Sequence, residues 1–188
     1  MTQDQSRFDV TSQLAALRRY GLSLTRNAAD AEDLVHETLV RAYEKRGSFR
    51  ADRNLRSWLL SILHNCFVDA SRKRSSETVK LLRASEQAET YAPPPQDHAI
   101  RLTQIRQAFM ALPEEQRAAL HLVAIEGLSY QEAAATLGIP VGTLMSRLGR
   151  ARAALRAIED GGAAAAPAQD TPRAGHLRIV GGFDDTAG

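Results

Sequence analysis

Apolar residues recur every three to four positions along most of this chain, and the strict alternation typical of a strand is nearly absent. This spacing predicts seven helices and an all-α protein. We expect the helices at roughly Ser12–Thr25, Ala28–Lys45, Leu55–Ser71 (with an extension towards Ala84 left open), Asp97–Leu112, Glu114–Glu126, Tyr130–Leu137 and Val141–Ile158.

The helical pattern is interrupted once in the middle and stops before the end. The segment SEQAETYAPPPQ, residues 85–96, has three consecutive prolines, which favour an extended chain over a helix. We therefore expect two small helical domains, residues 1–84 and 98–159, joined by a flexible Pro-containing linker at 85–97. Residues 160–188 are rich in Gly, Ala and Pro, which predicts a disordered tail.

The last two predicted helices have the signals of a helix-turn-helix. Ser129 is a suitable N-cap for the first helix, and Glu132 three residues later completes a capping box. Gly138 suits a left-handed C-cap, and Pro140 prevents the helix from continuing through the turn. On the second helix one stripe is apolar and is expected to pack on Ala133, Ala134 and Leu137; it consists of Val141, Leu144, Leu148, Ala151 and Leu155.

The second helix of this pair is basic. It contains Arg147, Arg150, Arg152 and Arg156, and no acidic residue occurs between Glu132 and Glu159. The formal net charge of the whole chain is only +2, so this basic character is local. A basic second helix in a helix-turn-helix favours double-stranded DNA as the partner. The alternative is an ordinary helical hairpin with a solvated basic face.

The N-terminal half has a second possible nucleic-acid signal, because aromatic residues are interleaved with Arg and Lys between Phe49 and Arg74. Such a combination suits unstacked bases on a charged platform. Trp58 and Phe67, however, are also spaced as helix-core residues, so both interpretations stay open. Nearby, the charges of the Ala28–Lys45 helix are explained by a solvated face or by a face that binds a partner.

The sequence contains no signal for an enzyme, a cofactor or a metal. There is no Walker loop, dinucleotide-binding glycine pattern or HExxH motif. The histidines lie far apart and are expected at the surface or in the core: His36, His64, His98, His121 and His176. The single cysteine, Cys66, excludes an internal disulfide, and with no signal peptide or apolar run of about 20 residues we expect a cytoplasmic protein without a membrane span.

Three motifs, in this order, resemble those of the extracytoplasmic-function (ECF) sigma factors of bacterial RNA polymerase. They are DAEDLVHETLVRAYE, FRADRNLRSWLLSILHN and ALPEEQRAALHLVAIEGLSYQEAAATLGIPVGTLMSRLGRAR. The resemblance covers about Leu14–Arg74 and Ile105–Arg156.

The resemblance implies a role for each segment. The second helix would bind core RNA polymerase through Asp33, Glu37, Arg41 and Glu44. The third would capture and melt the −10 promoter element, with Asn65 reading a flipped base and Arg72, Lys73 and Arg74 holding DNA. The helix-turn-helix would read the −35 element as duplex through Met145, Ser146, Arg147, Gly149, Arg150 and Arg152.

The resemblance also implies regulation and has its limits. We expect a monomer in isolation, held inactive by an anti-sigma factor, and associated with the nucleoid when active. Met145 and Gly149 stand where relatives often have a basic and a larger residue, so the −35 sequence preference does not transfer.

Two other functions are alternatives for a chain with a helix-turn-helix. A stand-alone helix-turn-helix regulator would need no strand-separation segment. A sigma-like decoy that sequesters an anti-sigma factor would be free to lose its basic residues, which this chain retains.

Overall fold

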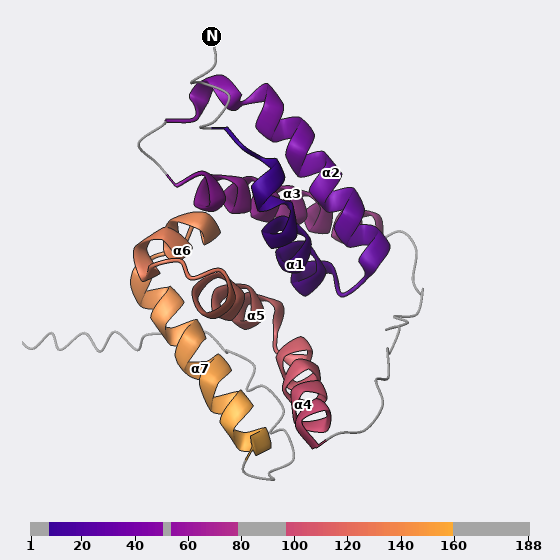
Figure 1. Ribbon diagram of the computed structural model, residues 1–188, viewed down its shortest axis with the longest axis vertical. Helices are drawn as coiled ribbons and strands as arrows, with labels where there is room; N and C mark the ends of the chain where they lie inside the picture. Colours follow the sequence, from indigo (N-terminus) through magenta and orange to yellow (C-terminus); the bar gives the residue numbers. More distant parts are fainter. Residues whose placement is uncertain (1–7, 51–53, 79–96, 160–188) are drawn as a thin grey trace, which may run out of the picture.

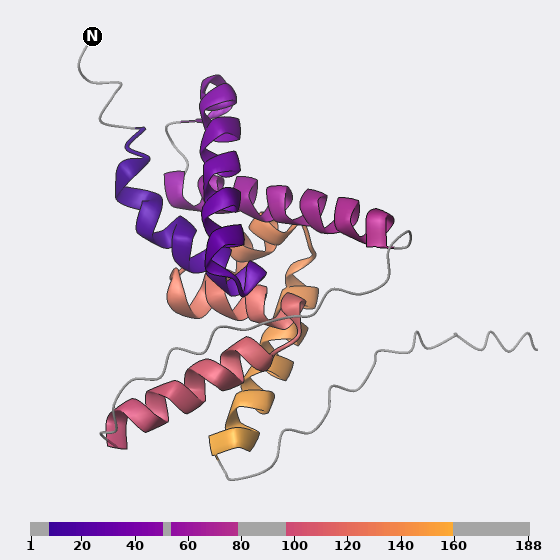
Figure 2. The ribbon, with the colours of Figure 1, turned by 90° about the vertical axis from the view of Figure 1, so that its right-hand side faces the viewer.

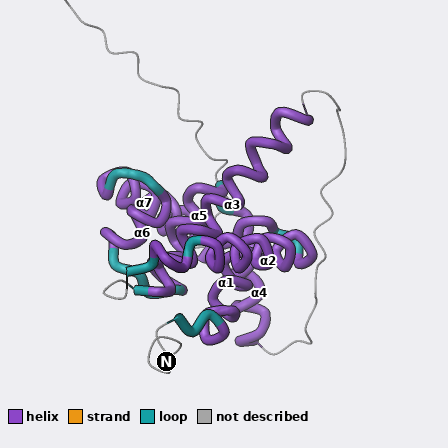
Figure 3. The backbone as a smooth tube through the Cα atoms, turned by 90° about the horizontal axis from the view of Figure 1, so that it is seen from above, coloured by secondary structure: helices purple, strands orange, loops and turns teal. Residues whose placement is uncertain are grey.

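The computed structural model describes residues 8–50, 54–78 and 97–159 (Figure 1). Throughout this part of the chain every regular element is helical, as predicted (Figure 3). Most of the expected linker and the whole of the expected tail, residues 160–188, lie outside the described residues.

Three helices make up the N-terminal half. A short 3-10 turn, Thr11–Gln13, leads into α1 (Leu14–Thr25), and α2 spans Ala28–Glu44. After a second 3-10 turn, Arg46–Ser48, α3 runs from Leu55 to Thr78, beyond the expected minimum at Ser71. Side-chain caps fix two of the starts: the Asn27 side chain accepts a hydrogen bond from the Asp30 backbone at 3.1 Å, and Asn54 accepts one from the Arg56 backbone at 3.0 Å.

Four helices make up the C-terminal half: α4 (Asp97–Ala111), α5 (Glu114–Leu120), α6 (Tyr130–Leu137) and α7 (Val141–Glu159). The bounds agree with the sequence prediction except for α5. We expected one helix over Glu114–Glu126, but α5 is followed by a π-helical turn at His121–Ile125. In this wider turn the Glu126 N–H donates to the His121 carbonyl at 3.0 Å, five residues back, a register that apolar spacing does not reveal.

The two halves pack against each other. In Figure 1 α2 and α3 lie in the upper part and α4 and α7 in the lower part, and between them α1 lies beside α5 and α3 beside α6. Figure 2 shows the same arrangement from the side, where α5 and α6 lie directly below α1 and α3. A single cluster of buried apolar side chains runs through both halves.

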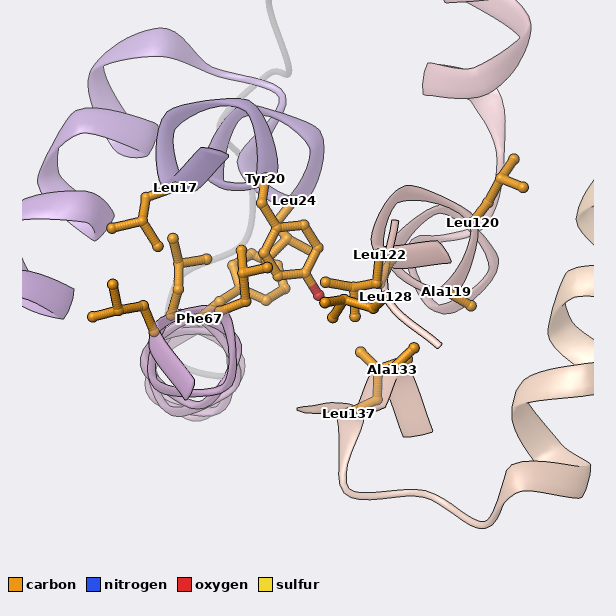
Figure 4. Packing of buried hydrophobic residues seen from close by; sticks show 14 of the residues in the cluster. Leu17, Tyr20, Leu24, Phe67, Ala119, Leu120, Leu122, Leu128, Ala133 and Leu137 are labelled. Carbon is orange, nitrogen blue, oxygen red and sulfur yellow. The ribbon is translucent and has the colours of Figure 1, made fainter. Parts of the chain in front are cut away.

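Tyr20 of α1 is at the junction of this cluster. Its side chain is fully buried, and its ring reaches from α1 towards Leu122 and Leu128 of the other half (Figure 4). Leu17 and Leu24 lie on the same helix as Tyr20, and Phe67 lies below it on α3 (Figure 4). Two regions that are separated by the predicted linker therefore share one core.

Candidate nucleic-acid interface

The turn between α6 and α7 has the geometry that its sequence predicts. The Ser129 side chain accepts a hydrogen bond from the Glu132 backbone at 3.2 Å, and the Glu132 carboxylate accepts one from the Ser129 backbone at 2.9 Å. Hydrogen bonding from Ser129 also lowers the pKa of the Glu132 carboxyl. Gly138 ends α6 with φ of 64°, in the left-handed region. The capping box and the glycine C-cap are confirmed.

The inner face of α7 packs as expected from its second turn onwards. Leu144, Leu148 and Ala151 are at most 1% exposed, and they pack in the cluster with Ala133 and Ala134 of α6. Val141 was predicted on the same stripe, but it is 39% exposed, so this prediction is wrong. It is the first residue of α7 and directly follows the Pro140 turn, so the buried stripe begins with Leu144.

The outer face of α7 is exposed over the residues predicted to contact the −35 element. Met145 is 54% exposed, and the other exposed members are Ser146, Gly149, Arg150 and Arg152. The Ser146 hydroxyl donates to the Gly142 carbonyl of its own helix at 3.0 Å.

Arg147 differs from the other arginines of α7. Its side chain is only 19% exposed, and its guanidinium pairs with the Glu115 carboxylate at 2.8 Å. Glu115 belongs to α5, so the absence of acidic residues along α7 itself did not reveal this partner. Arg150 lies on the outer face, opposite the buried stripe, whereas the exposed Arg152 lies at its edge, with its guanidinium 3.4 Å from the Tyr130 hydroxyl of α6. Arg147 lies between α7 and α5.

On α3 the residues predicted for the −10 element are all exposed. Asn65 lies in the middle of the helix and Arg72, Lys73 and Arg74 lie near its end. The guanidinium of Arg74 is 3.9 Å from the Asp30 carboxylate at the start of α2.

The aromatic residues of this segment belong mainly to the packing. Phe67 is 5% exposed and belongs to the core. Trp58 is partly buried and contacts Phe49 and Phe8, with ring centroids 5.2 and 5.9 Å away. Of the two interpretations left open, the structure supports core residues for both Trp58 and Phe67.

A cleft separates α3 from α6 at the join between the two halves. It has a volume of about 480 Å³ and is lined mostly by polar side chains. Trp58 and Ser57 contribute from α3, and Thr136 and Gln131 contribute from α6. The Ser57 and Thr136 hydroxyls approach to 3.4 Å. Sequence reasoning missed this cleft because its two walls are about 80 residues apart in the chain.

The outer face of α2 presents both charge and apolar surface. Asp33, Glu37 and Glu44 are exposed. Arg41 donates to Glu37 at 2.8 Å, the expected helical pair, and also to Asp69 of α3 at 3.1 Å. The hydrogen bonds to Asp69 and Glu37 raise the pKa of the Arg41 guanidinium.

Two large apolar residues on α2 were not among the predicted contacts. Tyr43 is 63% exposed and Val40 is 44% exposed. The Arg46 guanidinium lies 4.0 Å from the centre of the Tyr43 ring. Exposed apolar residues beside charges are typical of protein interfaces, and their helical spacing was the available signal.

Two histidines lie beside Tyr20 at the junction of the halves. The Tyr20 hydroxyl and His64 Nδ1 are 3.1 Å apart, and the His121 and Tyr20 ring centroids are 5.1 Å apart. Burial, with a smaller effect from the Arg147 charge, lowers the pKa of His64 to about 4. Among the described residues there is no group of side chains that could hold a metal ion, and no helix is long and apolar enough to cross a membrane.

Two family models match this chain. The model described as Sigma-70 region 2 matches residues 10–77, and the model described as Sigma-70, region 4 matches residues 102–155. The first match covers α1–α3 and the second covers most of α4 with α5–α7.

Proteins with similar sequences are named as ECF RNA polymerase sigma factors. The ECF RNA polymerase sigma factor EcfG of Rhodopseudomonas palustris is 40% identical over 181 residues, which cover 95% of this chain and 97% of that protein. The ECF sigma factor SigE of Mycolicibacterium smegmatis is 37% identical over 73% of this chain and 55% of its own length.

Solved structures extend the similarity to the arrangement in space. The sigma factor RpoE, in a complex with the anti-sigma factor NepR from Bartonella quintana, matches with a TM-score of 0.72 at 34% identity, over 85% of this chain and 98% of that chain. CnrH, in a complex with the cytosolic domain of CnrY, matches with a TM-score of 0.59 at 28% identity, over 86% of this chain and 92% of that chain. The chain therefore belongs to the ECF sigma factors of bacterial RNA polymerase, which are transcription initiation factors and not enzymes.

Proposed function

We propose that this sigma factor divides promoter recognition and polymerase binding among three exposed helix faces. The outer face of α7 binds the −35 element, α3 captures and melts the −10 element, and the outer face of α2 binds core polymerase. The observation that carries the proposal is the division of α7 into a buried apolar face and an exposed face that includes Met145, Gly149 and Arg150.

The −35 surface is the outer face of α7. Because Leu144 and Leu148 fix the helix against the core, its opposite face is presented as a rigid unit. Met145, Ser146 and Gly149 lie where they would face base edges, and Arg150 and Arg152 are exposed beside them to contact phosphates. Arg147 contributes only if it gives up its ion pair with Glu115.

The −10 surface is the exposed side of α3. Asn65 has an amide that can donate to and accept from the edge of an unpaired base. Arg72, Lys73 and Arg74 follow two turns later and place positive charge where a phosphate backbone would run.

The polymerase surface is the outer face of α2. Asp33, Glu37 and Glu44 supply negative charge, and Arg41 is held in place by Glu37 and Asp69. Val40 and Tyr43 add apolar area on the same helix, which gives the interface a component that salt does not screen.

Regulation by an anti-sigma factor is part of the proposal. The similar sigma factor RpoE was solved in a complex with the anti-sigma factor NepR, and the similar CnrH in a complex with the cytosolic domain of CnrY. An inhibitor that covers the α2 face or the α7 face excludes polymerase or DNA, because one surface cannot serve two partners. We propose a monomer in isolation, located in the cytoplasm and associated with the nucleoid when active.

Run-off transcription with purified core polymerase on a mapped promoter tests the polymerase surface. Reversing both charges, Asp33→Lys with Glu37→Lys, is expected to weaken polymerase binding at unchanged helical content. The control is Glu32→Lys, since Glu32 also lies on α2 but pairs with Arg18 of α1 at 2.9 Å. Normal binding by the double variant would show that another face is used.

Permanganate footprinting on the same promoter tests the DNA surfaces. Arg150→Ala is expected to weaken the closed complex at the −35 element. Asn65→Ala is expected to impair strand opening at unchanged −35 affinity. Normal opening by the Asn65 variant would remove this residue from the −10 surface.

A further inference from the structure

A carboxylate of the C-terminal half is buried against an arginine of the N-terminal half. The side chain of Glu126 is fully buried. Arg19 of α1 donates to both of its oxygens, with distances of 3.0 to 3.2 Å, and a guanidinium nitrogen of Arg56 on α3 is 3.8 Å away. His121 of its own half contacts the same carboxylate at 3.2 Å. The two arginines near Glu126, Arg19 and Arg56, therefore belong to the N-terminal half, whereas Glu126 belongs to the C-terminal half.

A second set of contacts joins the end of α1 to the start of α5. The Arg117 side chain is almost fully buried, and its guanidinium donates to the carbonyls of Ser23 and Leu24 in the last turn of α1. Those carbonyls form the negative end of the helix and have no partner within it. In return, Arg26 donates to the Leu112 carbonyl at 3.2 Å. Each half therefore donates arginine hydrogen bonds to backbone carbonyls of the other half.

These contacts are polar, and their groups can be hydrated when the halves separate. Arg19 is already 50% exposed in the packed form. The junction therefore combines the apolar packing around Tyr20 with charged pairs that water can solvate once the halves separate. The packed arrangement is thus built so that it can open.

The packed arrangement is incompatible with binding both promoter elements at once. Elements centred near −35 and −10 are about 25 base pairs apart, or on the order of 85 Å along straight DNA. A compact unit of this size has a radius of gyration of only about 14 Å. The 18 residues between α3 and α4, residues 79–96, are long enough to span roughly 60 Å when extended. The halves therefore have to separate for promoter recognition.

We propose that Arg19, Arg26, Arg117 and Glu126 form an interdomain latch that holds this sigma factor in a closed, inactive form, and that core polymerase binds after the latch opens. The inference rests on the proposed function, because only a protein that binds both promoter elements needs to open. Because only open molecules bind polymerase, the apparent affinity equals the affinity of the open form multiplied by the fraction of molecules that are open.

The first test weakens the latch in the full-length protein. Arg19→Ala leaves the buried Glu126 carboxylate without its bidentate partner and is expected to raise the open fraction by roughly 10- to 100-fold. While the closed form predominates, the apparent affinity for core polymerase rises by the same factor. The matched control is Arg18→Ala, which removes an exposed pair with Glu32 inside the N-terminal half and is expected to change the affinity less than twofold.

The second test locks the closed form. Ser57 and Thr136 face each other across the cleft, so Ser57→Cys with Thr136→Cys places two thiols within reach of a disulfide. The oxidised protein, freed of oxidant, is expected to lose at least tenfold in promoter-dependent run-off transcription and to recover it on reduction. Each single-cysteine variant is the control for oxidation itself.

The outcomes separate the latch from the proposed function. If the locked protein transcribes as well as the reduced one, or if Arg19→Ala and Arg18→Ala bind polymerase equally, the latch is refuted. If the unmodified and the reduced proteins support no transcription with polymerase at all, the proposed function itself has failed.

Discussion

Tyr20, His64 and His121 lie together at the junction of the two halves. Burial raises the pKa of the Tyr20 phenol, so Tyr20 stays neutral and can donate to His64 Nδ1. For His121 the ring is 2% exposed, Nε2 contacts Glu126, and Nδ1 has no hydrogen-bond partner among the described residues. His121 is buried and His64 partly buried in the core and His36 is exposed, as expected, whereas His176 lies outside the described residues; the arrangement of His64 and His121 around Tyr20 needed the fold.

The lowered pKa of His64 predicts a loss of stability in mild acid. With a pKa of about 4 in the folded protein and about 6.5 in the unfolded chain, the unfolded state binds more protons between these pH values. Stability is therefore present near neutral pH and falls as the pH drops, by about 2 kcal/mol between pH 7.5 and 5. Denaturant unfolding at both pH values measures it.

The matched variants are His64→Gln and His36→Gln. Glutamine can still accept from the Tyr20 hydroxyl but does not titrate, so His64→Gln is expected to flatten the pH dependence. His36 is exposed on α2, and its replacement is expected to leave the dependence unchanged. An equal slope for the His64 variant and the unmodified protein would rule out His64 as the source.

The ion-pair partners of Arg147 and Glu126 could not be predicted from the sequence. Periodicity assigns a residue to a face of its own helix, and on this basis Met145, Gly149 and Arg150 are expected on the outside, where all three are exposed. The Arg147–Glu115 pair and the burial of Glu126 against Arg19 depend on which helices become neighbours. That information lies in the tertiary fold and not in the local pattern.

Whole elements were more predictable, because their ends are fixed by local chemistry. The caps at Asn27, Ser129 and Gly138 satisfy backbone groups within a few residues, so the sequence alone locates these ends. The π-helical turn at His121–Ile125 was not predicted. Its position follows from tertiary packing, since it lets Leu122 and Leu128 enter the core while Glu126 faces Arg19.

Removing the α6 cap is expected to weaken the helix-turn-helix. Ser129→Ala removes the acceptor for the Glu132 backbone and is expected to cost about 1 kcal/mol of stability. Thr143→Ala, at an exposed position on α7, is the control and is expected to change stability by less than about 0.5 kcal/mol. Thermal unfolding followed by circular dichroism measures both, and equal melting temperatures would contradict the role of the cap.

The charge on α7 predicts a defined salt dependence. If Arg150, Arg152 and Arg156 each neutralise one phosphate, binding of the full-length protein to a duplex with the −35 element should have a log–log salt slope of roughly −3. Arg150→Ala should reduce that slope by about one, whereas Met145→Ala should change affinity but not the slope. Fluorescence anisotropy over a salt series measures it, and a flat response would exclude phosphate anchoring.

At the scale of the whole molecule, the sequence predicted two helical domains and the structure shows two halves that share a core. The predicted division rests on the fading of the helical pattern around the prolines at 93–95, which lie outside the described residues. The packing between the halves was not visible, because Arg19 and Glu126 are 107 residues apart and no local pattern links them. The position of the cleft and of the latch therefore came from the structure alone.

The shared core predicts that the two halves unfold together. Tyr20 packs between both halves, and Arg117 and Arg26 join them by hydrogen bonds, so opening one half exposes buried groups of the other. Trp58 is the single tryptophan and packs against Phe8 and Phe49, so its fluorescence reports on the N-terminal half, whereas far-ultraviolet circular dichroism reports on all helices. In denaturant the two signals are expected to follow one transition with a common midpoint.

The variant Arg117→Met keeps much of the side-chain volume but removes the donors to the α1 carbonyls. Its two transitions are expected to separate, because the halves no longer stabilise each other. Separate midpoints in the unmodified protein would show that the halves fold independently and that the junction contributes little to stability.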